Sequence, residues 1–350
     1  MSAESAAAQA RAKSQQLVAN AAASFACKDY RAALDFCNQA VNADPMHMAA
    51  YVARAEASNL LGETVRVIAD CSAALNTRDP LCQPGRVAVE LALRARVLRA
   101  AAYLGRGDLG SAIQDCNSAI TLDERSAEAY VLRASAYTRF GQREKARGDY
   151  ELAKQLGSDS VELHSGLAYL YFQNSQFAES FRECGIAIER GSTSLEPYLT
   201  RCNIYLVYGK LSEALDDCSR AFAINPRSAD AHCNRGAVLA KLGRFSEALR
   251  DYTDAIELAS AAPLFYLRQR ASLFMQYGRL DEAIADCNQI VSLEPTYADG
   301  FVTRAQLFLE RRQYKEALVD LDTASSLNPD AAPVYLLRAL TQNQLGNFSA

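Results

Sequence analysis

The pattern of acidic, apolar and small residues along the chain repeats with a period of 34 residues. An acid followed by Cys, Tyr or Leu recurs at this interval from Asp115 to Asp251, and the same pattern appears at Asp70, Asp286 and Asp320. A fixed period of this length is typical of stacked supersecondary units. The pattern therefore predicts repeated structure and argues against a set of separate catalytic sites.

Ten copies of the pattern can be aligned; each copy is called a repeat, and a position within it a place. The eighth place is always small, the fifteenth is Gly in seven of ten repeats, and the twenty-seventh is Ala in eight of nine. Gly at mid-repeat ends a helix in the left-handed cap conformation, and Pro, which closes four repeats, stops a helix from continuing. Small residues on facing surfaces let two helices approach closely. Each repeat is therefore predicted to be a helix, a tight turn and a second helix. The repeats begin at Ser14, Met48, Leu93, Ala127, Val161, Leu195, Ala229, Leu264, Ala298 and Ala332.

These boundaries predict an all-α chain. Residues 1–13 form a lead-in helix or tail, residues 14–331 hold nine tandem repeats, and residues 332–350 supply the first helix of a tenth, incomplete repeat. An insertion at 80–90 makes the second repeat 11 residues longer, and it either projects from the row of helices or lengthens the first helix of repeat 3. Because the last helix is apolar and no second helix follows it, either this helix acts as the cap itself or the protein continues into further repeats or another domain. We favour the interpretation that the chain is a fragment of a longer protein.

The stretch AHCNRGAVLAKLGRFSEALRDYTDAIEL (231–258) resembles the tetratricopeptide repeat family at its small, turn and Ala places. The resemblance covers the chain from Ser14 to its end. It implies a right-handed superhelical solenoid of antiparallel helix pairs, without chemistry of its own. The first helices would line a concave face that holds peptides or partner proteins. The chain departs from the family where the Trp of the fourth place is replaced by another aromatic residue, at Tyr51, Tyr130, Tyr198 and Phe301.

A charged pair recurs inside the repeats. The seventh place is Arg in eight repeats, and the seven complete ones among them all have Asp at the twenty-third place. Repeat 1 loses both charges, with Asn20 and Phe36, and repeat 5 has Leu167 with Glu183. Charges on a solvated face would not keep this register, so we interpret the pairs as structural ion pairs between the two helices of a repeat. They join Arg54 to Asp70, Arg99 to Asp115, Arg133 to Asp149, Arg201 to Asp217, Arg235 to Asp251, Arg270 to Asp286 and Arg304 to Asp320.

Cysteine occupies the twenty-fourth place in six repeats, where other repeats have Tyr150, Tyr252 or Leu321. A place that accepts Cys, Tyr or Leu is a packing site, and buried thiols are inert. The ten cysteines indicate a reducing compartment such as the cytoplasm, with import into an organelle left open. The chain has three histidines, no C-x-x-C and no phosphate-binding Gly loop, so we predict no catalytic residue, no cofactor and no metal site.

Charge and hydropathy narrow the class of partner. The net charge of −4 argues against a nucleic-acid partner, because nucleic-acid affinity depends on clustered Lys and Arg. No apolar run approaches the roughly 18 residues that span a bilayer, so we expect no membrane insertion. A non-catalytic scaffold or adaptor for a partner protein remains, with its oligomeric state left open.

We predict a peptide groove along the first helices. The second place of the first helix is acidic in five repeats, and these acids would edge the groove. Alternatively, they only stabilise the helix N-terminus, where acids are ordinary. A groove with an apolar floor and an acidic margin should prefer a segment with apolar anchors and Lys or Arg between them. The floor comprises Val97, Val131, Phe172, Leu199 and Leu206 with the polar Asn203 and Asn234, and the margin comprises Glu128, Glu162, Glu196 and Asp230.

The alternative function is a co-chaperone module. One branch of the family grips the acidic tail of heat-shock chaperones with Lys, Asn and Arg side chains. Asn203 and Asn234 correspond to two of its asparagines, whereas Leu199, Phe265 and Gln269 lie where its cations would be needed. An acidic tail has little to bind without positive charge. Under this alternative the chain is the N-terminal part of a longer chaperone-linked protein.

Overall fold

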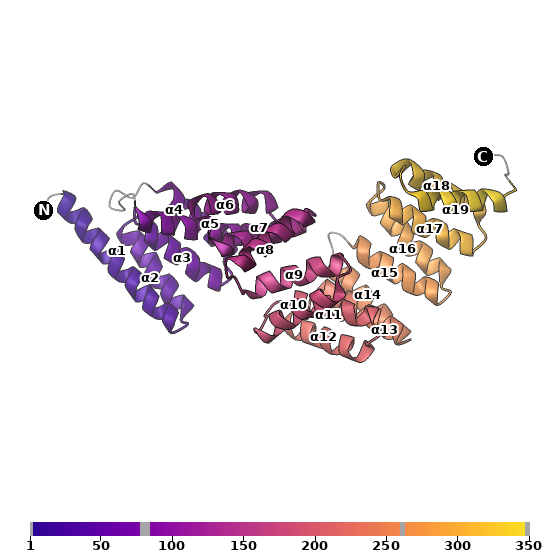
Figure 1. Cartoon of the computed structure of the whole chain (residues 1–350), viewed down its shortest axis with the longest axis horizontal. Helices are drawn as coiled ribbons and strands as arrows, with labels where there is room; N and C mark the ends of the chain where they lie inside the picture. Colours follow the sequence, from indigo (N-terminus) through magenta and orange to yellow (C-terminus); the bar gives the residue numbers. More distant parts are fainter. Residues whose placement is uncertain (1–2, 78–84, 260–262, 347–350) are drawn as a thin grey trace. The chain divides into compact units, whose positions relative to one another are not determined.

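The computed structural model describes residues 3–77, 85–259 and 263–346, and these contain 19 α-helices and no strand (Figure 1). The predicted all-α helical repeat is confirmed. Eighteen of the helices form nine consecutive pairs, which coincide with repeats 1–9, and α19 (Ala332–Gln344) is the first helix of the tenth. The pairs are α1 (Ala3–Ala26) with α2 (Tyr30–Ala43), α3 (Met48–Leu60) with α4 (Thr64–Asn76), α5 (Arg86–Arg106) with α6 (Leu109–Leu122), α7 (Ala127–Arg139) with α8 (Arg143–Gln155), α9 (Val161–Gln173) with α10 (Phe177–Glu189), α11 (Glu196–Val207) with α12 (Leu211–Ile224), α13 (Ala229–Lys241) with α14 (Phe245–Leu258), α15 (Leu264–Gln276) with α16 (Leu280–Leu293) and α17 (Ala298–Glu310) with α18 (Tyr314–Leu327).

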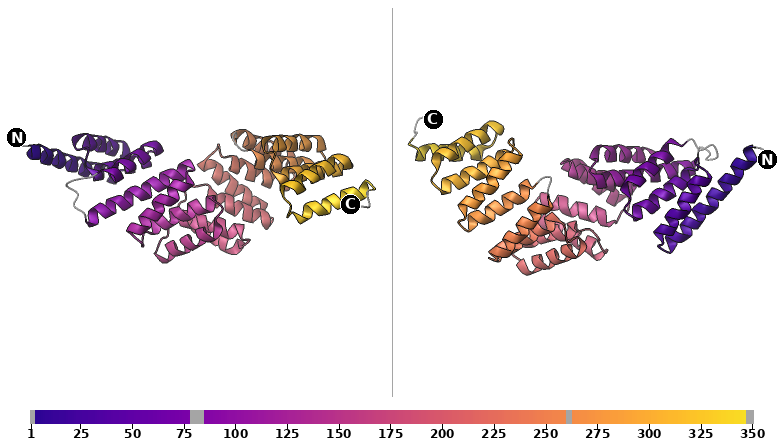
Figure 2. Two further views of the ribbon diagram at one scale, coloured as in Figure 1. Left: turned by 90° about the horizontal axis from the view of Figure 1, so that it is seen from above. Right: turned by 180° about the vertical axis from the view of Figure 1, so that it is seen from behind.

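The chain divides into two compact units, Met1–Arg190 and Gly191–Ala350. The N-terminal unit contains α1–α10 and the C-terminal unit contains α11–α19. Within each unit, consecutive helices run antiparallel and lie side by side (Figure 2). The division falls between repeats 5 and 6, at a point that the repeat pattern alone does not mark.

The turn inside each repeat has the same backbone conformation whatever residue occupies it. The seven glycines at the fifteenth place have φ between +69° and +80°. Lys28, Ser175 and Arg312 replace Gly in the other three repeats, and their φ values are +58°, +59° and +58°. An L-residue in this left-handed region costs about 1–2 kcal/mol. The packing of the helix pair therefore imposes the turn even where the local sequence disfavours it.

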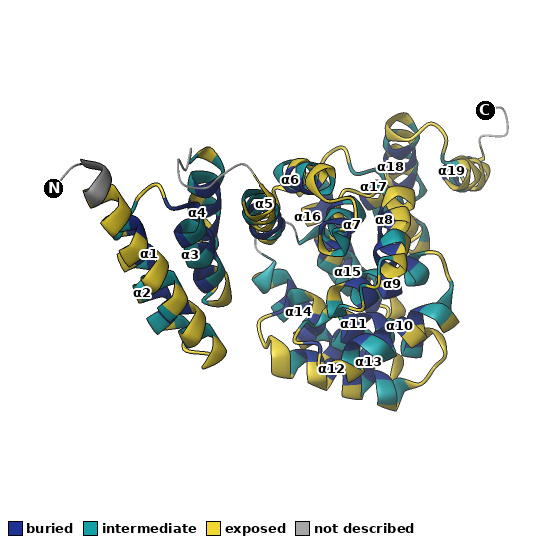
Figure 3. Cartoon of the chain, turned by 60° about the vertical axis from the view of Figure 1, so that its left-hand side comes forward, coloured by how far each residue is buried: buried dark blue, intermediate teal, exposed yellow. Residues whose placement is uncertain are grey.

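The core lies where helices meet, and its small and large residues compensate for one another (Figure 3). In repeat 8 the eighth-place Ala271 clusters with the twenty-fourth-place Cys287, and both are buried. In repeat 7 the twenty-fourth place holds the larger Tyr252, and the eighth place is Gly236. A Cβ on Gly236 would lie 3.1 Å from the Tyr252 ring, so the glycine makes room for it.

The lead-in at residues 1–13 and the insertion at residues 80–90, both outside the repeat pattern, contribute to helices. The lead-in forms one helix with repeat 1, because α1 begins at Ala3. Helix α5 begins at Arg86, seven residues before the predicted start of repeat 3. The described part of the 80–90 insertion therefore lengthens this helix, and residues 80–84 lie outside the described residues. Even the longest of the described helices lacks the apolar length needed to cross a bilayer.

Candidate binding face and buried polar groups

The first helix of each repeat leaves places 2, 9 and 13 fully or partly exposed, and these places lie along one side of the helix. In the N-terminal unit, Arg94 at place 2 of α5 connects this side across three repeats. Its Nε donates to Glu56 Oε1 of α3 at 2.8 Å, and its Nη1 donates to Glu128 Oε2 of α7 at 3.2 Å. The exposed sides of consecutive first helices are therefore neighbours, and we call them the first-helix face.

The C-terminal unit has its own first-helix face. The Tyr266 hydroxyl of α15 donates to Asp230 Oδ1 of α13 at 2.7 Å. Arg268 of α15 lies 3.9 Å from Asp299 Oδ2 of α17 and also lies over the ring of Phe265, 5.7 Å from its centroid. These contacts join α13 to α15 and α15 to α17 through their exposed sides.

The predicted apolar floor is partly wrong, because the fifth place faces the core in the three repeats whose fifth-place residue was assigned to it. Val97, Val131 and Leu199 are 3%, 5% and 8% exposed and cannot line an open groove. Val97 clusters with Ala129 of the next repeat, and Val131 with Leu163 of the next. In repeats 3 and 4 the fifth place therefore packs one repeat onto another, a role that the spacing inside a single repeat does not reveal.

The remaining predicted floor residues are half-buried. Phe172 packs against Phe177, with ring centroids 5.7 Å apart, and Leu206 packs beside the core of repeat 6. Asn203 is half-buried on α11, and Asn234 Nδ2 donates to the Leu199 carbonyl at 3.3 Å. Asn234 is thus engaged in joining two repeats.

The predicted acidic margin is exposed, and other apolar groups accompany it. Each of its acids lies in the first turn of a first helix, so the helix-dipole interpretation fits the geometry as well. In the C-terminal unit the first helices also carry exposed apolar side chains, among them Val207, Phe265 and Met275, and in the N-terminal unit Tyr169 is one. The acids are Glu128, Glu162, Glu196 and Asp230.

The structure places each of the seven predicted Arg–Asp pairs in bidentate contact. In every pair Nε donates to Oδ2 at 2.7–2.9 Å and Nη2 donates to Oδ1 at 2.5–2.7 Å. The aspartates are buried, whereas the arginine side chains keep some exposure. In Arg99 the hydrogen bond to Asp115 raises the pKa of the guanidinium against the effect of burial. The ion pair therefore holds the two helices of a repeat together, and it satisfies the hydrogen-bonding capacity of the buried carboxylate.

Sequence reasoning missed a second bond made by five of these arginines. Their Nη1 donates, at 2.7–3.3 Å, to the side chain at the twenty-fifth place of the preceding repeat. The available signal was a recurrent Asn, Ser or Thr at that place, next to the cysteine site. Each of these arginines thus links its own helix pair to the previous one. The partners are Asn38, Ser72, Asn117, Thr253 and Asn288.

Repeat 5 lacks the arginine and satisfies its buried Glu183 differently. His164 Nδ1 lies 2.5 Å from Glu183 Oε2, and Lys154 Nζ donates to Glu183 Oε1 at 3.1 Å. His164 Nε2 lies 2.7 Å from Asp159 Oδ1, and Asp159 also pairs with Arg190. Burial alone would raise the pKa of Glu183, but the hydrogen bonds from His164 and Lys154 hold it below its ordinary value. We call these five residues the His164 network.

The described cysteines act as packing groups. None of the nine forms a disulfide, and the six at the twenty-fourth place are buried. Burial raises the pKa of the Cys71 and Cys287 thiols to about 12, which disfavours the reactive thiolate. Cys82 lies outside the described residues.

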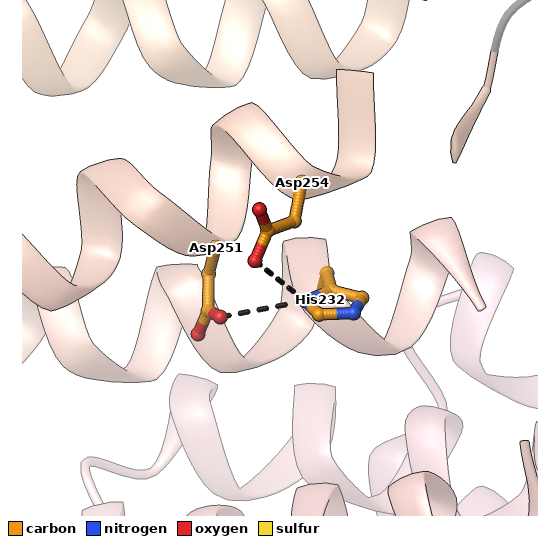
Figure 4. A group of neighbouring side chains, drawn as sticks. All are labelled: His232, Asp251 and Asp254. Atoms are coloured by element: carbon orange, nitrogen blue, oxygen red, sulfur yellow. Dashed lines mark hydrogen bonds and ion pairs between the residues drawn. The ribbon is translucent and has the colours of Figure 1, made fainter. Parts of the chain in front are cut away.

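One group in the described part of the chain gathers three possible metal ligands. His232, Asp251 and Asp254 bring a ring nitrogen and two carboxylate oxygens within 4.8 Å of one another (Figure 4). This group is not visible as a motif in the sequence, because its ligands come from two helices, α13 and α14, and are not closely spaced along one segment.

Comparisons with known proteins match this architecture. Two family models match the chain, "Tetratricopeptide repeat" at residues 229–260 and "TPR repeat" at residues 203–243. No curated protein matches the sequence.

Among solved structures, a chain of the APC/C hetero-tetramer Cut9–Hcn1 is similar with a TM-score of 0.65 and 14% identity over 89% of this chain. This chain spans only 59% of that one. A tetratricopeptide repeat protein from Parabacteroides merdae ATCC 43184 has a TM-score of 0.55 and 18% identity, covering 72% of this chain and 99% of its own. Yeast Tom70 has a TM-score of 0.51 and 13% identity, covering 96% and 89%. At these identities the similarity shows the fold.

Proposed function

The chain belongs to the tetratricopeptide repeat family, and from this premise we propose that it is a non-catalytic scaffold that binds a partner protein along a first-helix face. Proteins of this fold serve protein interaction and are generally non-catalytic. The observation that carries the proposal is the face itself. Its exposed side chains lie in a row on the first helices of successive repeats, while the buried charges between the helices are engaged in holding the repeats together.

The face of the C-terminal unit favours a partner segment that is both basic and apolar. Place 2 is acidic in α11, α13 and α17, and in α15 it is Phe265, which is 49% exposed. Val207 and Met275 add exposed apolar surface on the same helices. Acids attract Lys and Arg, and apolar side chains gain from burial in a complex. A segment that alternates the two kinds of residue fits this surface.

The free cysteines support the proposal that the protein acts in a reducing compartment such as the cytoplasm. Ten cysteines are present, and those described are unbridged although two of them lie close together. Cys202 Sγ and Cys218 Sγ are 3.3 Å apart in the core of repeat 6. Such a pair stays reduced where thioredoxin and glutathione maintain thiols.

Peptide titration of the whole chain tests the proposal. Fluorescence anisotropy would compare a basic-apolar peptide with an acidic Glu-Glu-Val-Asp tail at low and high salt. We expect the basic-apolar peptide to bind more tightly and to weaken as salt rises. In a Glu196→Lys/Asp230→Lys variant, two exposed attractions become repulsions, and affinity for the basic peptide should fall about tenfold.

The matched control is Asp216→Lys. Asp216 is an exposed acid on the second helix α12, so it changes the net charge without touching the first-helix face. The control reverses one charge and the double variant reverses two, so a control that loses half as much binding free energy as the double variant would show that only net charge matters. Preferential binding of the acidic tail would replace the proposal with the co-chaperone function.

A further inference from the structure

The seventh repeat carries a cluster that its role in packing does not explain. His232 lies on α13, and Asp251 and Asp254 lie three residues apart on α14, one turn of the helix (Figure 4). His232 Nδ1 is 3.4 Å from Asp251 Oδ1 and 3.7 Å from Asp254 Oδ2. The His232 side chain is 13% exposed and that of Asp254 is 40% exposed, so the cluster lies at the edge of the core with access to solvent.

The other ring nitrogen of His232 indicates how the ring is protonated. Nε2 lies 3.2 Å from the Pro226 carbonyl oxygen, which can only accept a hydrogen bond, so Nε2 carries a hydrogen. A neutral ring then directs the lone pair of Nδ1 toward two carboxylate oxygens. Three electron-rich atoms in this arrangement can be bridged by a cation, either a proton on Nδ1 or a metal ion. The same hydrogen bond from the distal nitrogen to a backbone carbonyl is what orients metal-binding histidines.

The two distances from His232 Nδ1 to the carboxylate oxygens are close to the spacing of ligands around a metal ion. The distances of 3.4 and 3.7 Å are longer than a good N–H···O hydrogen bond. Zn²⁺ binds His nitrogen and Asp oxygen at about 2.0–2.2 Å, and tetrahedral ligands at that distance are about 3.3–3.6 Å apart. We propose that His232, Asp251 and Asp254 bind a divalent transition-metal ion, with Zn²⁺ as the type, and leave a fourth position open to solvent.

Arg235 has a supporting position in this site. It donates to both oxygens of Asp251, at 2.7 and 2.5 Å. Each carboxylate oxygen has two lone pairs, so Oδ1 can hold the guanidinium on one side and a metal ion on the other. The arginine fixes the orientation of the carboxylate in the way that outer groups orient metal ligands.

The sequence makes this repeat distinct. Only repeat 7 has an acid at the twenty-sixth place, and it is also one of only two with His at the fourth. The other is repeat 5, where Ile186 occupies the twenty-sixth place and both nitrogens of His164 face carboxylates. The inference is independent of the proposed partner binding.

Isothermal titration of Zn²⁺ into the whole, phosphine-reduced chain tests the site. We expect one ion per chain at this site, and substitution of one ligand should weaken it at least about tenfold. The variants are Asp254→Asn and His232→Gln, which are close in size and leave the Arg235–Asp251 pair in place. Asp216→Asn, another exposed acid on a second helix, is the matched control and should bind as the wild type does.

Three further readouts separate this site from thiol binding and from misfolding. Circular dichroism should show the same helicity in all variants, and Zn²⁺ should raise the Tm of the wild type and the control only. Co²⁺ should give visible absorption without the charge-transfer band of a thiolate. The proposal is overturned if Zn²⁺ binds no more tightly to the wild type than to both ligand variants, or if Co²⁺ reports thiolate ligands.

Discussion

Repeats 5 and 7 both have a polar residue at two equivalent places, but they compensate the charge of the buried acid in different ways. Both have His at the fourth place, His164 and His232, and both have a buried acid at the twenty-third, Glu183 and Asp251. In repeat 7, Arg235 binds both oxygens of Asp251. Repeat 5 has Leu167 instead of the arginine, and His164 and Lys154 share Glu183.

The difference shows what the recurrent arginine does. A buried carboxylate is tolerated only with a cation beside it, and the two repeats take that cation from different places in the chain. The acid at the twenty-third place therefore needs a compensating charge and not an arginine as such. The recurrent ion pairs therefore serve the stability of each repeat, and repeat 7 differs in placing a second acid and a histidine beside its pair.

The largest effect is expected from breaking the His164 network. His164→Ala leaves Glu183 buried with Lys154 alone, and it should destabilise the chain by about 3–5 kcal/mol in denaturant unfolding followed by circular dichroism. Adding Leu167→Arg in this background gives repeat 5 the arginine of the other repeats and should restore part of the loss. A loss as small as that of an exposed His→Ala would contradict the comparison.

A smaller loss is expected when the arginine of repeat 7 is removed. Arg235→Ala takes two charge-assisted hydrogen bonds from Asp251, and it should destabilise the chain by about 1.5–3 kcal/mol, since the Arg235 side chain is 35% exposed. A double-mutant cycle with Asp251→Ala should give a coupling of about 0.5–3 kcal/mol. Strict additivity of the two single changes would show that the pair does not act as a unit.

Glycines in the first helices of the two repeats should respond unequally to the same change. A Cβ on Gly166 of α9 would lie 2.1 Å from the Tyr150 hydroxyl oxygen, whereas a Cβ on Gly236 would lie 3.1 Å from the nearest Tyr252 ring carbon. Gly166→Ala should therefore cost about 1–3 kcal/mol, and Gly236→Ala less than this. Tyr150→Leu should relieve the first change, because Leu is accepted at this place in repeat 9. Equal Tm losses for the two Ala variants would contradict this account.

Acid should weaken repeat 5 through Glu183. Its pKa in the folded state is below the ordinary value of 4.5, so its ionised form stabilises the fold above about pH 4.5. This contribution is lost as pH falls through the folded-state pKa. Comparing the Tm of the wild type and Glu183→Gln between about pH 6 and pH 3 should show the wild type losing more stability. Parallel curves would mean that the network does not depend on this carboxylate.

The smallest effect is expected at the turn. Ser175 of repeat 5 has φ +59°, and Gly243 of repeat 7 has φ +74° at the same place. Ser175→Gly should relieve left-handed strain and stabilise the chain by about 0.5–1 kcal/mol after the entropy cost of glycine, and Gly243→Ser should do the reverse. Thermal unfolding of both variants measures the pair, and a loss of stability in Ser175→Gly would overturn the strain argument.

The sequence by itself determined the helix pairs and the bonds inside each pair. Three features recur at fixed places: the small residue at the eighth, the turn at the fifteenth, and the Arg–Asp pair, whose members are 16 residues apart. All three depend on contacts between the two helices of one repeat, so they can be recognised in the sequence from its period of 34 residues. Helices α1 and α5 begin at Ala3 and Arg86, before the predicted repeat starts at Ser14 and Leu93, because the preceding residues continue the same helix.

Only the tertiary structure decided what happens between repeats. Val97 and Val131 are buried because the next repeat covers them, and Arg270 reaches Thr253 because the previous helix pair lies beside it. The same holds for His232, whose ring nitrogens face Asp251 and the Pro226 carbonyl. A repeating pattern gives the order of places along one unit, whereas burial depends on the distance and angle at which the next unit packs, and these are set by all the contacting side chains together.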